Sequence, residues 1–179
     1  MKKFIYSLFL FLICSSFTVA QDWIDYKSED LAFIAEFPSE PTRTLEKVNT
    51  AVGELDMHMI MYAPTSGDDN AVYSVIKSDY PESQFKNADD EYNSKVLDGA
   101  VNGAVTNVNG KLLYDNKITF NGYPGRDFKV EISGGFLYIK AYLVNNSMYI
   151  TQVICISVND KNTSIKRFFD SFDIIKVKE

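Results

Sequence analysis

Two neighbouring apolar segments near the C-terminus constrain the fold more than any other part of this sequence. Residues 136–144 and 148–158 are apolar at successive positions, not only at alternate ones. A strand that is apolar on both sides is usually covered on both faces. The polar residues Asn145, Asn146 and Ser147 between the segments are typical of a hairpin loop. We therefore expect an antiparallel hairpin near the centre of a covered sheet.

Shorter segments around this hairpin alternate between apolar and polar residues, as half-buried strands do. Glycine, proline and asparagine separate them at short intervals, and Gly53 lies between two of them at a position typical of a hairpin. The pattern predicts many short strands. The predicted strands outside the central hairpin are residues 31–37, 42–50, 54–62, 71–76, 111–120 and 123–132.

Two segments have the spacing of amphipathic helices, and the first can be capped by Asn87 or Asp89. Its first turn is acidic, which suits the positive end of a helix. Gly99 and Gly103 weaken this helix, and their spacing suggests close packing against a sheet. Its predicted core-facing residues are Tyr92, Val96, Leu97, Ala100, Val101, Ala104 and Val105.

The second helix lies near the C-terminus and can begin at Asn159, Asp160 or Asn162. Its apolar residues recur at three- and four-residue spacing, which predicts one buried face. An amphipathic helix could bind a partner, but packing on the chain's own sheet is the simpler interpretation. The predicted buried face consists of Ile165, Phe168, Phe169 and Phe172.

Residues 1–20 have the organisation of a secretory signal peptide. Two lysines precede an apolar run over residues 4–14, which is too short to span a bilayer. Cleavage after the small residue Ala20 would leave a mature chain of residues 21–179. We expect this chain to be a single domain that is periplasmic or secreted.

An alternative processing route would attach a lipid to Cys14. Lipoprotein signals require a small residue directly before the lipidated cysteine, whereas Ile13 is large. We therefore favour cleavage without lipidation. The mass of the mature N-terminus distinguishes the two routes, because a chain that begins at Gln21 cannot carry the lipid.

The charge of the mature chain argues against several kinds of partner. Loss of Lys2 and Lys3 with the signal changes the net charge from −6 to −8. An acidic surface repels phosphate groups, so nucleic acid and anionic lipid are poor partners. No second apolar run is long enough for a membrane-spanning helix.

Cys155 is the only cysteine of the mature chain, so no internal disulfide can form. It lies in the apolar run "YITQVICISV", which predicts a small buried side chain. A reactive thiol would need a nearby cation or a helix N-terminus. The sequence around Cys155 indicates neither.

His58 is the only histidine and could supply the base for a serine or cysteine nucleophile. It lies in an alternating strand without a nucleophile-elbow motif, so we expect a structural or surface role. Met57, Met59 and Met61 alternate with it. Thioethers with an imidazole could bind Cu(I), but a strand directs the imidazole to the opposite face. We therefore expect the methionines to pack in the core.

Oxygen ligands gather in a loop-like segment that contains Asp68, Asp69 and Asn70, and calcium prefers such ligands. The segment lacks the spacing of an EF-hand loop, so we expect a solvated turn. One histidine and one cysteine cannot form a usual zinc site. We predict no metal and no cofactor. Paired carboxylates could still form a hydrolase site, but no spacing singles out a pair.

Residues 121–126 read Asn-Gly-Tyr-Pro-Gly-Arg and could form an anion-binding loop or a turn. Anion-binding loops usually open a helix, whereas the residues after Arg126 alternate as a strand does. Asn-Gly can supply positive φ, and Pro124-Gly125 suits the central positions of a type II turn. We predict a strand connection, with Arg126 and Tyr123 as candidate ligand contacts.

Four short sequence segments, in this order, resemble segments of one known family. "LAFIAEFPSEP" resembles its opening strand, "NGYPGRDFKVEI" its Gly-Tyr-Pro-Gly hairpin, "NNSMYITQV" a later strand and "RFFDSFDI" its closing helix. Together they resemble the bacterial exported members of the PsbP-like superfamily, which includes the DcrB-like periplasmic proteins. The resemblance covers nearly the whole mature chain. It implies an α+β fold, an α/β/α sandwich whose central antiparallel sheet is covered by helices.

The resemblance implies little about function, because a fold hosts many functions. Plant members assist a photosystem, and a yeast nuclear-import member binds a small GTPase. Since the sequence shows no catalytic constellation, our hypothesis is a non-enzymatic, exported module of the bacterial cell envelope. It would bind an unknown protein or small molecule, or assist assembly, as a monomer. The alternative is an exported hydrolase that uses carboxylates alone.

Overall fold

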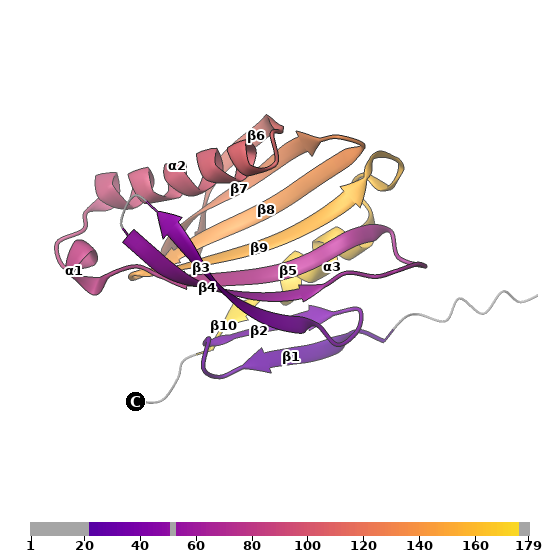
Figure 1. Cartoon of the computed structure of the whole chain (residues 1–179), viewed down its shortest axis with the longest axis horizontal. Helices are drawn as coiled ribbons and strands as arrows, with labels where there is room; N and C mark the ends of the chain where they lie inside the picture. Colours follow the sequence, from indigo (N-terminus) through magenta and orange to yellow (C-terminus); the bar gives the residue numbers. More distant parts are fainter. Residues whose placement is uncertain (1–21, 51–52, 176–179) are drawn as a thin grey trace, which may run out of the picture.

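The computed structural model describes residues 22–50 and 53–175. Within them the chain forms two antiparallel sheets and three α-helices, an α+β fold in which strands predominate. Figure 1 shows the large sheet between the long helix α2 (Asp90–Asn107) and the small sheet. The expected signal peptide and Cys14 lie outside the described residues.

The large sheet has seven strands in the order β3-β4-β5-β9-β8-β7-β6. The hairpin of β8 and β9 lies at its centre, as predicted from the two segments that are apolar on both sides of the strand. β9 also pairs with β5, which joins the two halves of the sheet. The strands are β3 (Thr42–Thr50), β4 (Gly53–Tyr62), β5 (Asn70–Asp79), β6 (Lys111–Phe120), β7 (Tyr123–Ile132), β8 (Gly135–Val144) and β9 (Ser147–Ile156).

The small sheet has three strands, β1 (Ile24–Ser28), β2 (Phe33–Phe37) and β10 (Asp173–Ile174), with β2 in the middle. Only β2 was predicted. β10 has two residues, too few for any period, and β1 alternates between exposed and partly buried positions. Pairing with β2, which is separated from β10 by most of the chain, stabilises both strands.

Alternate residues of β8 belong to different core clusters, which defines two faces of the large sheet. Tyr138 and Tyr142 point to one face together with α3 (Thr163–Ser171) and β2, and we name it the α3 face. Phe168 of α3 is completely buried there, with its ring 5.3 Å from Phe37 and 5.5 Å from Tyr73. The side chain of Asn162 caps α3 by accepting from Ile165 N at 3.2 Å.

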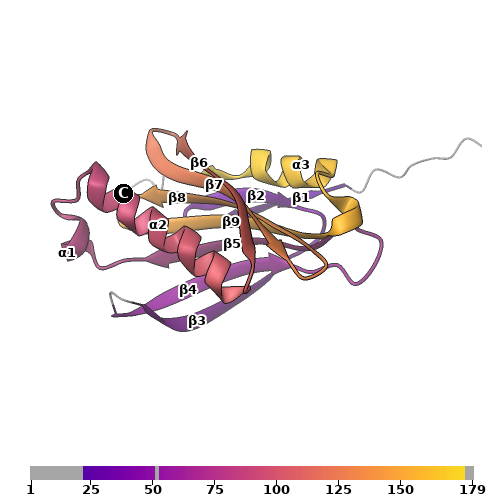
Figure 2. The same ribbon diagram turned by 90° about the horizontal axis from the view of Figure 1, so that it is seen from above.

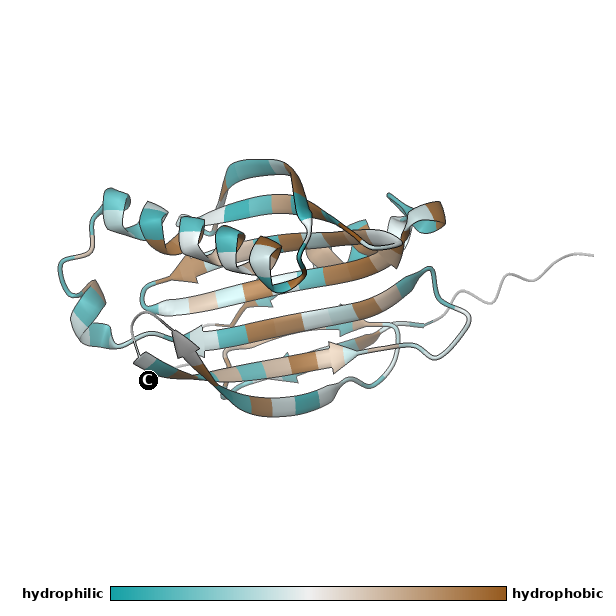
Figure 3. Cartoon of the chain, turned by 45° about the horizontal axis from the view of Figure 1, so that its top comes forward, coloured by the Kyte–Doolittle hydropathy of each residue, from teal (hydrophilic) through white to brown (hydrophobic). Residues whose placement is uncertain are grey.

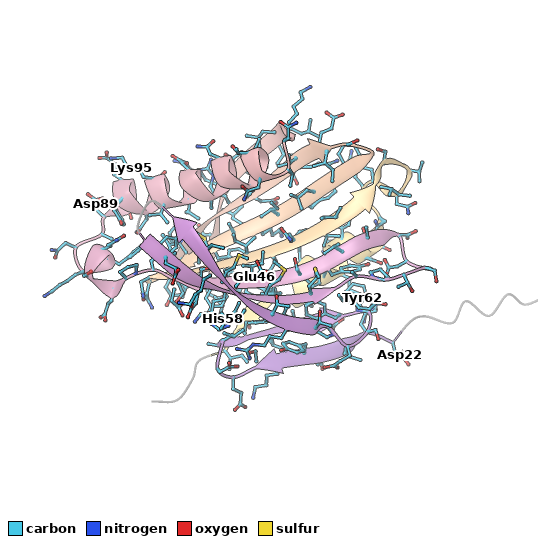
Figure 4. The ribbon with its side chains drawn as sticks, viewed as in Figure 1. Asp22, Glu46, His58, Tyr62, Asp89 and Lys95 are labelled. Atoms are coloured by element: carbon cyan, nitrogen blue, oxygen red, sulfur yellow. The ribbon has the colours of Figure 1, made fainter. Side chains whose placement is uncertain are left out.

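The opposite face, the α2 face, is covered by α2 over β7 and β8 (Figure 2). Asp89 caps this helix by accepting a hydrogen bond from the backbone N–H of Tyr92 at 2.8 Å (Figure 4). Leu97 and Val101 are its buried residues. The prediction that Gly99 and Gly103 pack closely against the sheet is wrong, because a Cβ at either position would meet no atom within 4 Å.

The half of the α2 face formed by β4 and β5 contributes no residue to the core cluster beneath α2. Figure 3 shows these strands without a helix above them. Met59 lies opposite Ile76, which lies opposite Ile150, so all three share this face. Met57, Met59 and Met61 are only partly buried and belong to neither core cluster. Their predicted role in the core is therefore wrong, because α2 stops short of their strand.

Across the described residues, no helix has both the length and the apolar character needed to cross a membrane.

Candidate binding cleft beside the β6–β7 turn

A cleft of about 850 Å³ lies at one end of the large sheet. It forms where the short helix α1 (Glu82–Phe85) and the first turn of α2 approach the β6–β7 and β8–β9 turns. Ligand sites commonly have volumes of this order. The lining residues are Glu82, Ser83, Phe85, Lys86, Ala88, Asn93, Tyr123, Pro124, Leu143, Asn145 and Asn146.

Hydrogen bonds hold the chain before α1 to the β8–β9 turn. The backbone N–H of Tyr80 donates to the carbonyl of Asn146, and the Asn146 side chain donates to the Tyr80 carbonyl, both at 2.8 Å. The ring of Phe85 lies 5.7 Å from that of Tyr80 and 5.3 Å from that of Tyr92. Both ends of α1 are therefore anchored, so this wall of the cleft is preformed.

Tyr123 and Pro124 at the start of β7 supply the third wall, and the β6–β7 turn that precedes them is tighter than expected. Asn121 and Gly122 both have positive φ and form a two-residue turn between Phe120 and Tyr123, which are paired. This geometry fits a type I′ hairpin. The strand connection was predicted correctly, but the type II turn at Pro124-Gly125 is wrong, because both residues lie within β7.

Gly125 is required by packing rather than by a turn. A Cβ at this position would lie 2.6 Å from the carbonyl oxygen of Ala141 on β8 and 2.9 Å from the ring of Tyr142. Only glycine allows β7 to approach β8 this closely. The sequence could not reveal this reason, because the contact is made by the neighbouring strand.

The walls of the cleft mix amide, hydroxyl and apolar groups. Lys86 and Ser83 are exposed at the rim, and Asn93 and Asn145 line the cleft with Leu143. Such a lining can bind a neutral polar group against an apolar floor. It contains no pair of acids and no histidine. Among the described residues, no three His, Cys, Asp or Glu side chains lie close enough to hold a metal.

The two predicted contact residues, Tyr123 and Arg126, occupy different places. Tyr123 lines the cleft, and its ring packs beside the α3-face core. Arg126 lines a smaller adjoining cleft of about 340 Å³, which shares Asn93 and Pro124 with the first. A ligand that fills both clefts would lie beside both Tyr123 and Arg126. Contact between these residues and a ligand stays a prediction.

Arg126 is already paired within the protein. The residue is 9% exposed, and its side chain donates to Asp98 of α2 and to both carboxylate oxygens of Asp115 on β6, with 2.7 Å between Nε and Oδ1. The hydrogen bonds that Arg126 donates to Asp115 raise the pKa of Arg126 above its usual value. The guanidinium therefore joins α2, β6 and β7, a role that sequence spacing could not show.

Lys129 makes a second buried charge network on the α3 face. Its Nζ donates to both oxygens of Asp160 at 2.7 and 2.9 Å and lies 3.8 Å from the ring centre of Phe136. The hydroxyl of Tyr138 also donates to Asp160. Burial raises the pKa of Asp160, but the hydrogen bonds from Lys129 and Tyr138 outweigh it, so the net pKa is lowered. Asp160 holds this network instead of capping α3.

The carboxyl groups give the hydrolase alternative no support. Among the described residues, the shifted carboxyl pKa values belong to Glu29, Asp30, Asp79 and Asp160, and all are lowered. A glycosidase acid needs a raised pKa to stay protonated near neutral pH. The lowered values are those of carboxylates that accept hydrogen bonds from the protein itself.

The structure gives no support to His58 as a catalytic base or to Cys155 as a reactive thiol. His58 is on the α3 face of β4, opposite Leu45 and one pair away from Glu46 on β3 (Figure 4). Its Nδ1 lies 3.5 Å from the guanidinium of Arg43. Cys155 is 1% exposed, and burial raises the pKa of its thiol, so the expected inert side chain is confirmed.

The acidic loop before β5 is a hydrogen-bonded junction rather than a solvated turn. Oδ1 of Asp68 accepts from the backbone N–H of Asn70 at 2.8 Å and from the hydroxyl of Tyr73 at 2.7 Å. The side chains of Asn70 and Asn162 bind each other at 2.8 and 3.1 Å. Asn159 donates to the carbonyl of Asp69 at 3.0 Å. These contacts join the loop to the start of α3.

No family model matches this chain, and no curated protein matches it. Among solved structures it is similar to the solution structure of cyanobacterial PsbP (CyanoP) from Synechocystis sp. PCC 6803. The TM-score is 0.53 at 13% sequence identity, over 90% of this chain and 96% of that chain. The fold is therefore PsbP-like, which confirms the resemblance read from the sequence. At this identity the likeness shows the fold alone.

Proposed function

We propose that this chain, whose fold is PsbP-like, is an exported, non-enzymatic module of the bacterial cell envelope. It binds a protein or small molecule, or assists assembly, after cleavage near Ala20. The mature chain of residues 21–179 acts as one domain and as a monomer. In this proposal the fold is an α/β/α sandwich, with α2 and α3 on opposite faces of the large sheet.

The observation that carries the proposal is the cleft beside the β6–β7 turn. Its walls come from four separate segments, and hydrogen bonds between Tyr80 and Asn146 hold two of them together. A preformed site lowers the entropic cost of binding. The cleft offers hydrogen-bonding groups and a single carboxylate, that of Glu82, so it lacks the pair of acids that the hydrolase alternative requires.

The chemistry of the lining narrows the class of ligand. Asn93 and Asn145 offer both donors and acceptors, and Leu143 offers apolar surface. Lys86 is balanced at the rim by Glu82, so the cleft has no strong preference for an anion. The acidic mature chain disfavours nucleic acid. A neutral polar segment of a protein, or a small molecule of that character, fits best.

The test is a pull-down from envelope extract with the purified protein as bait. The Ser83→Trp/Lys86→Glu variant fills the cleft and reverses its exposed cation, while Lys111→Glu is a matched charge reversal on β6 outside the cleft. We expect the wild type and Lys111→Glu to retain the same partner and the cleft variant to lose it.

Two results would count against this proposal. If the wild-type bait retains nothing above background, the binding function loses its support. If the cleft variant retains the partner as well as Lys111→Glu does, binding occurs elsewhere on the molecule. Circular dichroism of each bait confirms that a loss of the partner does not reflect unfolding.

A further inference from the structure

Three of the four methionines beyond Met1 lie together on one strand. Met57, Met59 and Met61 alternate along β4, so their side chains share the α2 face. In the register of the sheet they lie opposite Ser78, Ile76 and Ser74 of β5. The fourth, Met148, is 3% exposed in the core beneath α2.

The position of the three methionines leaves their side chains partly exposed. They are partly buried, they belong to neither core cluster, and no helix lies above their strand (Figure 3). A methionine that only fills a core would resemble Met148. This half of the α2 face therefore presents three partly buried methionines that belong to neither core cluster.

We propose that Met57, Met59 and Met61 form a thioether site for Cu(I). Soft ligands such as thioethers favour Cu(I) over harder divalent ions. Successive residues on one face of a strand are about 7 Å apart, and a methionine side chain has three rotatable bonds. The sulfur of Met59 can therefore turn toward the same ion as the sulfur of either neighbour.

The imidazole and thiol groups of the described residues lie away from this face. The imidazole of His58 is on the opposite face beside Arg43, and the thiol of Cys155 is buried on that face too. Neutral thioethers compensate no charge on a divalent ion, which further favours a monovalent one. Glu46 lies opposite Met57 on β3 and offers one nearby negative charge.

A thioether site has a pH signature of its own. Metal affinity falls with acidity when the ligands must first lose a proton, as histidine and cysteine do. The thioether of methionine carries no such proton. Affinity for Cu(I) should therefore stay within twofold between pH 5.5 and 7.5, as expected from ligands that do not titrate.

The site is independent of the cleft, because none of the three methionines lines it. Binding of Ag(I), a redox-stable analogue of Cu(I), can be measured calorimetrically in chloride-free buffer. Competition with a Cu(I) chelator without oxygen then measures Cu(I) itself. The variants are Met59→Leu, the triple leucine variant, Met148→Leu as the buried-methionine control, and His58→Ala.

We expect one Ag(I) and one Cu(I) per chain. Met59→Leu should weaken both at least tenfold and the triple variant should abolish binding, whereas Met148→Leu and His58→Ala should match the wild type. Leucine has a similar volume and keeps the apolar surface, so folding is retained and docking of an apolar partner would survive. Affinity of the triple variant within twofold of the wild type would overturn the site. Equal loss in His58→Ala would overturn it as well, because an imidazole would then be a ligand.

Discussion

The α3 face of the large sheet is covered from β4 to β8 by α3 and the small sheet, whereas α2 covers the opposite face over β7, β8 and part of β9 and leaves β4 and β5 without a helix. On the first face, aromatic rings such as those of Phe168, Phe37 and Tyr73 contact one another in a closed core. On the second, Met59 and Ile76 stay partly exposed. The difference indicates that the α3 face supplies most of the stability and that the α2 face is available for binding.

We call the α3 face the closed face, and the half of the α2 face formed by β4 and β5 the open face. The largest expected effect comes from truncating an aromatic ring on the closed face. Phe168→Ala leaves a cavity between Phe37 and Tyr73 and should lower the free energy of unfolding by about 3–5 kcal/mol. Met59→Ala, on the open face, should cost only about 1 kcal/mol, because less apolar surface returns to water. Urea denaturation of both variants measures the contrast. Equal losses would show that the open face is as important for stability as the closed one.

Alanine substitutions at two glycines, one on each side of the large sheet, should change the stability by smaller amounts and in opposite directions. Gly125→Ala places a Cβ against the carbonyl oxygen of Ala141 and the ring of Tyr142, so it should destabilise the protein by about 1–3 kcal/mol. Gly99→Ala, in α2, meets no atom and should stabilise the helix by about 0.5–1 kcal/mol. Thermal unfolding compares them. A stabilising Gly125→Ala would contradict the close approach of β7 to β8.

The smallest effect concerns the charge network of the closed face and depends on pH. The folded protein lowers the pKa of Asp160 below its usual value of 3.8, so the unfolded chain binds a proton first. The resulting stability is present above about pH 4 and is lost as the pH falls through the folded pKa. Asp160→Asn should make the free energy of unfolding less dependent on pH in that range.

The Tyr138→Phe variant tests the cause of this pH dependence. It removes one hydrogen bond to Asp160 but keeps Lys129, so its pH dependence should lie between those of the wild type and Asp160→Asn. The slope is the informative measurement, because Asp160→Asn also leaves the buried Lys129 without its charged partner. Identical slopes in all three proteins would show that Asp160 does not control acid unfolding.

The sequence by itself determined the features that depend on local period and local chemistry. Successive apolar residues in 136–144 and 148–158 marked the central hairpin, and Asp89 was one of two caps proposed for α2. Phe168 was placed on the buried face of α3. These predictions are confirmed because each depends on neighbours within a few residues along the chain. The sequence could name Tyr123 and Arg126 as candidate contacts. It could not show that Tyr123 lines the larger cleft and Arg126 the smaller one.

Only the tertiary structure decided which surfaces are covered. Alternation shows that Met57, Met59 and Met61 share a face, but not that α2 leaves their strand uncovered. Gly125 looked like a turn residue because its true constraint, Ala141, lies on the next strand. Burial of a strand face depends on elements distant in sequence, and no local pattern records their positions. For that reason the sequence predicted the strands, and the packing of α2 decided which of them remain open.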